Sequence, residues 1–209
     1  MISHKHRVIF VHIPKTAGQS IEHVFLSENG LAWGQRAALL LRQNRDPAAG
    51  PERLAHLFAC EYVSCGHMAA DDFSKYFKFA VIRDPLARLA SAYRFRHHSL
   101  GISFRQFVEE QLITEPLDLF SGRSRHIFPQ SCFVCGGDGN VLVDKLIIFE
   151  RLADEWPELS RTIFGRSLPL PLINVSPGPR DSLYDPYTRS VARAYYQRDF
   201  GLLDCLSRL

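Results

Sequence analysis

The sequence predicts a single α/β domain in which helices cover both faces of a central, mainly parallel sheet, giving three layers. Two short apolar runs, residues 7–13 and 77–82, have the composition of buried strands, and each leads through a loop into a helical pattern. The 209 residues suffice for one domain with a core, and they contain no internal repeat or linker. Because parallel strands joined by helices end at one edge of the sheet, we expect ligands to bind there.

Helical and turn signals place the other elements of the first half in order. The helix after the first strand has an apolar face made by Ile21, Val24 and Phe25. Asp84 is a good N-cap, and Pro85 suits the first position of a helix expected to run to about residue 98. Between the two strands we expect, in order, a helical patch at 36–41, a turn at 46–51, a second helical patch at 52–58 and a short strand ending at 65–67.

The second half is expected to continue this alternation. Ser103 suits the cap of a helix over 103–112, and Gly165 ends a helix over 152–164. The remaining elements are a strand at 131–134, a hairpin turn at 136–140, a strand at 141–149, a proline-rich loop over 166–181 and a last long helix over 182–200.

Composition limits the function classes. Hydrophobic residues make up 46% and charged residues 22% of the chain, as in an ordinary globular protein. The net charge of +3 suits an anionic ligand and is too small to indicate a nucleic-acid partner. No apolar stretch is long enough to span a bilayer, and the first residues lack the apolar region of a signal peptide. We therefore expect a cytoplasmic protein without a membrane span.

The loop at 14–20 has the features of a phosphate site. A strand that leads through a tight glycine-containing loop into a helix presents backbone N–H groups and the helix dipole to an anion. Lys15 adds a charge there, and Thr16 and Ser20 add hydroxyl donors. The order is not that of a Walker A loop, because Lys15 precedes Gly18 and the second glycine is missing. A simple strand-to-helix turn is the alternative interpretation of this loop.

A second anion site is predicted at the end of the second strand. Arg83 lies there, and Asp84, Arg88 and Ser91 share one face of the following helix. Arg83, with Arg88 or Ser91, could hold a phosphate through charge-assisted hydrogen bonds. The alternative is a surface ion pair of Asp84 with Arg88 and a solvated serine. Two anion sites at two strand ends suit a nucleoside that carries a phosphate at each end.

Both motifs resemble those of one enzyme family. FVHIPKTAGQS resembles the 5′-phosphosulfate loop of carbohydrate sulfotransferases of the heparan 2-O-sulfotransferase-like type (family 2), which use 3′-phosphoadenosine-5′-phosphosulfate (PAPS). FAVIRDPLARLASAYRF resembles their 3′-phosphate motif, R-D-P-x-x-R-x-x-S-x-Y, at every named position. The likeness extends from about residue 7 to residue 200. Looser agreement comes from residues 65–67, 129–131, 149–152, 174–176, 184–186 and 195–200.

The resemblance implies one sulfotransferase domain over 1–209 with a fold like that of P-loop nucleotide kinases. PAPS would be the co-substrate, adenosine 3′,5′-bisphosphate the product, and a hydroxyl of a carbohydrate or another molecule the acceptor, with no metal. The 5′-phosphosulfate loop would be 14–20 and the 3′-phosphate motif 83–93. The implied donor-binding residues are Lys15, Thr16, Ala17, Gly18, Gln19 and Ser20 for the phosphosulfate and Arg83, Arg88 and Ser91 for the 3′-phosphate.

The resemblance also implies catalytic roles. His67 matches the histidine that acts as general base, and an ordinary imidazole, with a pKa of about 6.5, can accept a hydroxyl proton at neutral pH. Lys15 would stabilise the charge that grows on the leaving phosphate. His12 is expected to pack and orient, and Glu150 to be structural or to orient a basic residue. Gln19 stands where many members carry threonine, which weakens one hydroxyl contact and leaves the backbone N–H groups of the loop in place.

Other interpretations stay open at this stage. A P-loop kinase or NTPase needs an Mg²⁺-binding hydroxyl directly after the lysine, which Thr16 could supply, but the glycines do not fit. A non-catalytic nucleotide-binding module would have no need of a base. Five cysteines favour free thiols, although four of them could form a zinc site: Cys60, Cys65, Cys132 and Cys135. The acceptor hydroxyl and the oligomeric state are not indicated by the sequence.

Overall fold

A computed structural model describes the chain apart from residues 97–100, 174–180 and 209. Its sheet has four strands in the spatial order β1 (Ile2–Ser3), β2 (Val8–Val11), β3 (Phe77–Ile82) and β4 (Lys145–Ile148). The short β1 pairs antiparallel with β2, whereas β2, β3 and β4 are mutually parallel. A mixed α/β fold with a mainly parallel sheet is therefore confirmed, on fewer and shorter strands than the apolar runs suggested.

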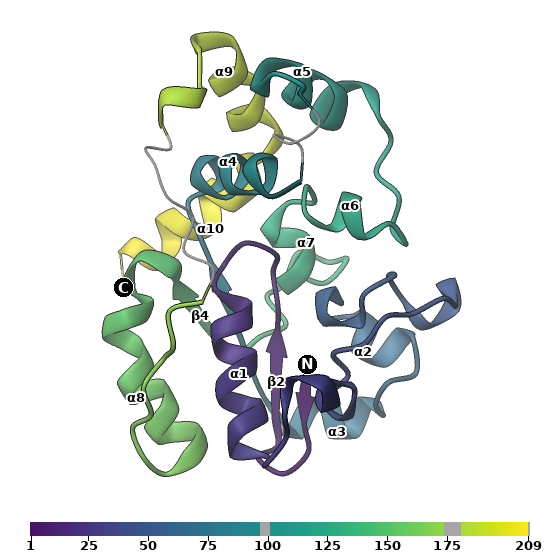
Figure 1. Cartoon of the computed structure of the whole chain (residues 1–209), viewed down its shortest axis with the longest axis vertical. Coiled ribbons are helices and arrows are strands. Elements are labelled where there is room, and N and C mark those ends of the chain that lie inside the picture. Colours follow the sequence, from purple (N-terminus) through teal and green to yellow (C-terminus); the bar gives the residue numbers. More distant parts are fainter. Residues whose placement is uncertain (97–100, 174–180, 209) are drawn as a thin grey trace.

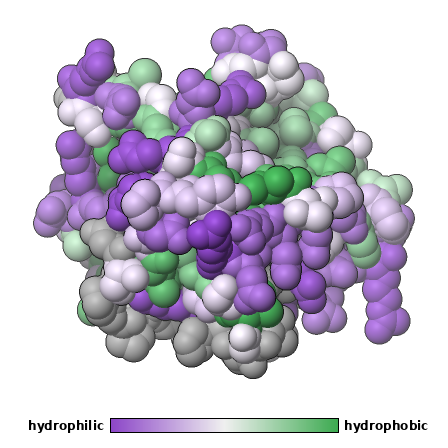
Figure 2. Space-filling view, turned by 90° about the horizontal axis from the view of Figure 1, so that it is seen from above, coloured by the Kyte–Doolittle hydropathy of each residue, from purple (hydrophilic) through white to green (hydrophobic). Residues whose placement is uncertain are grey.

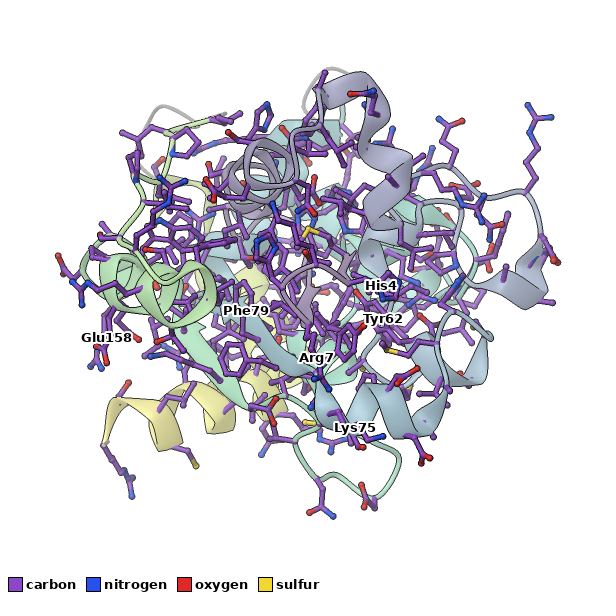
Figure 3. The ribbon with its side chains drawn as sticks, turned by 90° about the horizontal axis from the view of Figure 1, so that it is seen from below. His4, Arg7, Tyr62, Lys75, Phe79 and Glu158 are labelled. Atoms are coloured by element: carbon purple, nitrogen blue, oxygen red, sulfur yellow. The ribbon has the colours of Figure 1, made fainter. Side chains whose placement is uncertain are left out.

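Successive residues of each strand point to opposite faces of the sheet, and each face packs against its own helices. On one face, Phe10 and Phe79 pack with α1 (Gly18–Glu28) and α8 (Leu152–Phe164). On the other, Ile9 and Ala80 pack with residues 54–62, α7 (Gln130–Val134) and α10 (Gln197–Ser207). Seen from below, Phe79 lies in the interior, while the exposed Lys75 and Glu158 lie toward the outside (Figure 3). The sheet is thus the middle of three layers.

A separate helical cluster lies beyond the carboxyl ends of the strands. It joins α4 (Pro85–Arg96), α5 (Phe104–Glu109) and α9 (Pro186–Tyr195) through buried side chains that include Leu89, Tyr93, Phe107 and Ala192. In Figure 1, β2 rises to the connecting loop, α1 runs back down beside it, and α4 lies above that turn. This cluster therefore covers the edge of the sheet where the sequence predicts the ligand.

Several elements match their sequence signals closely. The strand at 77–82 is β3, and the helix at 152–164 is α8, which ends at Gly165 with φ of 73°. Asp84 accepts a hydrogen bond at 2.7 Å from the amide of Ala87, as an N-cap should. Ser103 forms a capping box with Gln106 at the start of α5, which continues as a π-turn over Glu110–Thr114. The expected helix end near residue 98 lies outside the described residues.

Other expectations were wrong or only partly right. The strand at 65–67 is replaced by α2 (Glu61–Ser64) and a turn, and the strand at 131–134 is the helix α7. The last long helix is divided into η7 (Asp181–Leu183), α9 and α10, with a break at Tyr196, whose hydroxyl donates to the carbonyl of Ile127 at 2.7 Å. The helical patches at 36–41 and 52–58 are 3₁₀ turns, η1 (Trp33–Leu39) and η3 (Leu54–His56). The smaller elements are η2 (Pro47–Ala49), α3 (Ala70–Lys75), α6 (Gly122–Arg125) and η6 (Phe149–Arg151).

Candidate functional site

A cleft of about 1320 Å³ opens at the carboxyl ends of β2 and β3. Four cationic side chains line it: Lys15, Arg53, Arg83 and Arg94. Among its described lining residues there is no aspartate or glutamate. An apolar part of its wall comes from η6, α8 and residues 168–173. Seen from above, apolar patches form a band bordered by hydrophilic residues (Figure 2). Such a cleft suits a ligand that is both anionic and partly apolar.

The loop at 14–20 takes its shape from two left-handed residues, Lys15 with φ of 72° and Ala17 with φ of 64°. They turn the chain so that the carbonyl of Ala17 accepts the amide of Ser20 and α1 begins at Gly18. The first-turn amides of a helix have no acceptors within the helix, so they and the helix dipole attract an anion here. Thr16 is fully buried and its hydroxyl donates to the carbonyl of Ile13 at 2.8 Å. Its side chain therefore shapes the loop instead of facing the cleft.

Gly18 is required by the packing of His12 beneath the loop. A Cβ atom at Gly18 would lie 1.8 Å from Nε2 of His12. The imidazole has little room to move, because it is buried and its Nδ1 lies 2.5 Å from Oε1 of the equally buried Glu22. The expectation that His12 packs is confirmed, and Glu22 fixes its ring; that it orients another group stays a prediction.

We expect Gly18→Ala to distort the loop, because the added methyl group and the His12 ring cannot share the space. Overpacking of this kind costs about 1–3 kcal/mol of folding free energy. The variant should show a lower melting temperature and a weaker affinity for adenosine 3′,5′-bisphosphate in calorimetry. Gly201→Ala is the matched control, since a Cβ there meets no atom within 4 Å. Wild-type affinity in Gly18→Ala would show that the loop tolerates a displaced His12.

Lys15 lies at the mouth of the cleft with its ammonium group over an aromatic ring. Its Nζ is 4.0 Å from the ring centroid of Phe95, and that ring stacks on His126 with a centroid separation of 5.5 Å. Phe95 is 58% exposed, although its ring contacts both Lys15 and His126. The ring therefore supports the lysine at the cleft in a cation–π contact.

The three residues expected at the second phosphate take different places. Arg83 and Ser91 line the cleft, and a guanidinium nitrogen of Arg83 donates to the carbonyl of Lys15 at 3.0 Å while the group lies over Phe149. Arg88 is 1% exposed and does not line the cleft. Its guanidinium donates to three backbone carbonyls, those of Pro14, His126 and Phe128. The assignment of Arg88 to the phosphate is not supported, because these bonds make it an internal tie between segments.

The end of β3 is held by a residue outside both motifs. The side chain of Gln130 accepts from the amide of Arg83 at 2.9 Å and donates to its carbonyl at 2.7 Å. Asp199 in turn accepts the amides of Gln130 and Ser131, at 2.7 and 2.9 Å, and so caps α7. This chain of bonds fixes the direction in which Arg83 enters the cleft.

The structure does not bring His67 to the cleft. Its Nε2 donates to the carbonyl of Ala49 at 2.8 Å. Three other histidines line the cleft instead, His12, His56 and His126. Sequence reasoning did not single out Arg53, Arg94, His56, His126 or Phe95. A signal existed only for Arg94, which lies three residues after Ser91 and therefore on the same helix face.

The remaining candidates lie outside the cleft. Glu150 is exposed in η6 and does not line it. All five cysteines are free thiols in the structure, and burial, as the largest cause, raises the pKa of four of them above the ordinary thiol value, so these four favour the inert protonated form: Cys60, Cys65, Cys132 and Cys135. Within the described part of the chain, no group of histidine, cysteine or acidic side chains could hold a metal ion.

Comparison with known proteins gives one result. A family model described as "Sulfotransferase family" matches residues 1–204. No curated protein and no solved structure matches the chain. In the described residues, no helix combines the length and apolarity needed to cross a bilayer.

Proposed function

The chain belongs to the sulfotransferase family, and on that premise we propose that it transfers a sulfuryl group from PAPS to a hydroxyl group of a carbohydrate. The observation that carries the proposal is the cleft itself. The loop at 14–20 and Arg83 both line it, and its described lining has four cationic side chains and no carboxylate. PAPS has a phosphosulfate at one end of adenosine and a phosphate at the other. A site that combines cationic side chains with an apolar wall fits such a ligand.

In this proposal different residues of the cleft bind the phosphosulfate, the 3′-phosphate and the adenosine. The first-turn amides of α1 and Lys15 hold the 5′-phosphosulfate and stabilise the charge that develops on the leaving phosphate. Arg83 and Ser91 hold the 3′-phosphate, and the apolar wall of Phe149, Leu152 and Trp156 takes the adenosine. The acceptor oxygen attacks sulfur in line with the bond that breaks. Positioning and preorganised charge supply the catalysis, so no metal is assigned.

The kinase alternative is less well supported by the loop. Mg²⁺-dependent phosphoryl transfer needs a free hydroxyl directly after the lysine. The hydroxyl of Thr16 is buried and donates to the carbonyl of Ile13. A non-catalytic binding module differs from the proposal in turnover alone, and turnover is therefore the decisive measurement.

We expect adenosine 3′,5′-bisphosphate to raise the melting temperature and ADP to bind much more weakly, since ADP lacks the 3′-phosphate that Arg83 would hold. Isothermal titration with both nucleotides measures the difference. Equal affinity for the two would remove the 3′-phosphate assignment.

Turnover is tested with ³⁵S-labelled PAPS against a panel of oligosaccharides, simple glycosides and phenols. We expect labelled sulfate to be transferred to a saccharide hydroxyl at the same rate with and without EDTA. Transfer to phenols alone would contradict the carbohydrate assignment. Loss of activity in EDTA that Mg²⁺ or Zn²⁺ restores would contradict the assignment of no metal, and binding without transfer to any acceptor or to water would favour the non-catalytic module.

A further inference from the structure

His56 is held beside the loop at 14–20 (the donor loop), and the function proposed above gives it no role. It is the last residue of η3, is 8% exposed and lines the cleft. Its Nδ1 donates to the carbonyl of His12 at 3.1 Å, and the two rings lie edge to face with centroids 4.6 Å apart. Because the His12 ring lies directly beneath Gly18, His56 is one ring away from the start of α1. That is where the phosphosulfate is proposed to bind.

The hydrogen bond to His12 also fixes the tautomer. With the proton on Nδ1, the lone pair of a neutral imidazole is on Nε2. Among the described residues, Nε2 of His56 has no hydrogen-bond partner. It does not belong to the fully buried polar atoms that lack a partner, so this nitrogen is accessible. The same nitrogen of His67 is occupied by the carbonyl of Ala49, and that of His12 lies against Gly18. His56 therefore offers a proton acceptor on the cleft, which His67 does not.

A buried ion pair makes the segment that carries His56 rigid. Arg125 forms two hydrogen bonds with the carboxylate of Glu61, at 2.6 and 2.9 Å, and a third with the carbonyl of His56 at 3.5 Å. Its guanidinium also lies 3.8 Å from the ring centroid of Phe58. A base held in this way loses little entropy when an acceptor binds, which is what general-base catalysis requires.

We propose that His56, and not His67, is the general base of the sulfuryl transfer; this rests on the function proposed above. Nε2 of His56 removes the proton of the acceptor hydroxyl as the acceptor oxygen bonds to sulfur. The bond between sulfur and the bridging oxygen breaks, and its electron pair stays on the 5′-phosphate. The products are the sulfated acceptor and adenosine 3′,5′-bisphosphate, and the proton leaves His56 to solvent through the cleft.

The charge around His56 is consistent with this role. Burial and the neighbouring His12 lower its pKa well below the ordinary histidine value, with further lowering by Arg53 and the N-terminal amine. Glu22 lies beyond His12, His126 lies edge to face with His56, and Arg125 is at its carbonyl. The neutral ring thus dominates at neutral pH, and an anionic donor in the cleft raises the pKa toward that of a more effective base.

The test compares His56→Asn with His67→Asn. An asparagine at 56 can still donate its amide to the carbonyl of His12, so the fold should persist while the base is lost. We expect His56→Asn to bind adenosine 3′,5′-bisphosphate with near wild-type affinity and to lose about 10²–10⁴-fold in kcat, the usual contribution of a general base. His67→Asn should keep turnover within about threefold. Turnover is measured with labelled PAPS and the best acceptor of the panel, or with water where no acceptor is found.

Two further measurements separate catalysis from folding. Imidazole added to His56→Ala should restore part of the turnover, because it fits the space left by the ring. The wild-type kcat/KM should stay high as the pH falls to the ordinary histidine pKa of about 6.5 and drop only below it. Wild-type turnover in His56→Asn, or its loss in His67→Asn alone, would overturn the inference and leave the sulfotransferase proposal standing. A wild-type protein that transfers nothing to any acceptor or to water would overturn both.

Discussion

Replacing Lys15 by alanine is expected to lower kcat/KM by about 10³–10⁵-fold, the largest effect of any single change at this site. One part is the loss of a charged hydrogen-bond donor to the bound phosphosulfate, about 1.5–3 kcal/mol. The other is the loss of charge stabilisation on the leaving phosphate, about 10²–10³-fold in kcat. The two add because charge on the bridging oxygen grows between ground state and transition state. A residue that only bound the donor would leave kcat unchanged.

The measurement separates the two parts by comparing the affinity for adenosine 3′,5′-bisphosphate with kcat at saturating PAPS. Lys15→Arg keeps the charge and should recover binding more than kcat, since a guanidinium places its charge differently. Lys75→Ala is the control for loss of a positive charge, because Lys75 is exposed on α3 on the lower side of the molecule (Figure 3). If Lys15→Ala weakens affinity and leaves kcat intact, Lys15 is a binding residue and the leaving group is stabilised by the loop amides alone.

Phe95 supports that lysine and allows a smaller test of the same idea. Its ring lies 4.0 Å from the ammonium group of Lys15. Such a contact contributes about 0.5–1 kcal/mol at an exposed position. We expect Phe95→Leu to lower kcat/KM by about threefold to fivefold in the wild type and to have no further effect in Lys15→Ala. Independent losses in this double-mutant cycle would show that Phe95 acts on the ligand and not through Lys15.

Local signals predicted those parts of the fold that depend on local chemistry. The apolar run of β3 and the glycine that ends α8 are each read within a few residues, and both have the predicted bounds. The sequence predicts a strand at 131–134, whereas the structure has the helix α7, which the carboxylate of Asp199 caps from 68 positions away in the sequence. No pattern within residues 130–134 carries that information. The same reason explains the division of the last helix at Tyr196, which is bonded to Ile127.

In the site, too, features set by neighbouring residues could be predicted from the sequence, and features set by distant residues could not. The motif indicated a strand-to-helix turn that contains a glycine. It did not indicate the left-handed conformations of Lys15 and Ala17, which only the structure shows. The burial of Arg88 did not follow, because arginine on a helix near an anion site is ordinarily a ligand, and here three carbonyls from two distant segments, Pro14 and residues 126–128, surround it. His56 stands in a sequence, ERLAHLF, that has no feature of a catalytic segment. Only the fold places it beside His12.

The two arginines of the second motif provide the other large effect, because we propose opposite roles for them. Arg83→Ala should lose about 2–4 kcal/mol of binding to adenosine 3′,5′-bisphosphate, since the 3′-phosphate would be left without its charged partner. It should lose almost nothing toward AMP, which is the same nucleotide without that phosphate. Calorimetry with both nucleotides measures the difference. A parallel loss toward both would show that Arg83 acts by holding the carbonyl of Lys15 at the loop.

Arg88→Met is the matched variant, and we expect it to lower the melting temperature and to leave the nucleotide preference unchanged. Methionine keeps much of the side-chain volume but leaves three buried carbonyls without a donor, and each such group costs about 1–3 kcal/mol. We therefore expect a large fall in the melting temperature of Arg88→Met and a smaller one for Arg83→Ala, because Arg83 lines the cleft whereas Arg88 is 1% exposed. The nucleotide preference of Arg88→Met, measured below its melting temperature, should stay that of the wild type. Loss of the preference for the 3′-phosphate in a stable Arg88→Met protein would return Arg88 to the phosphate site and contradict its role as an internal tie.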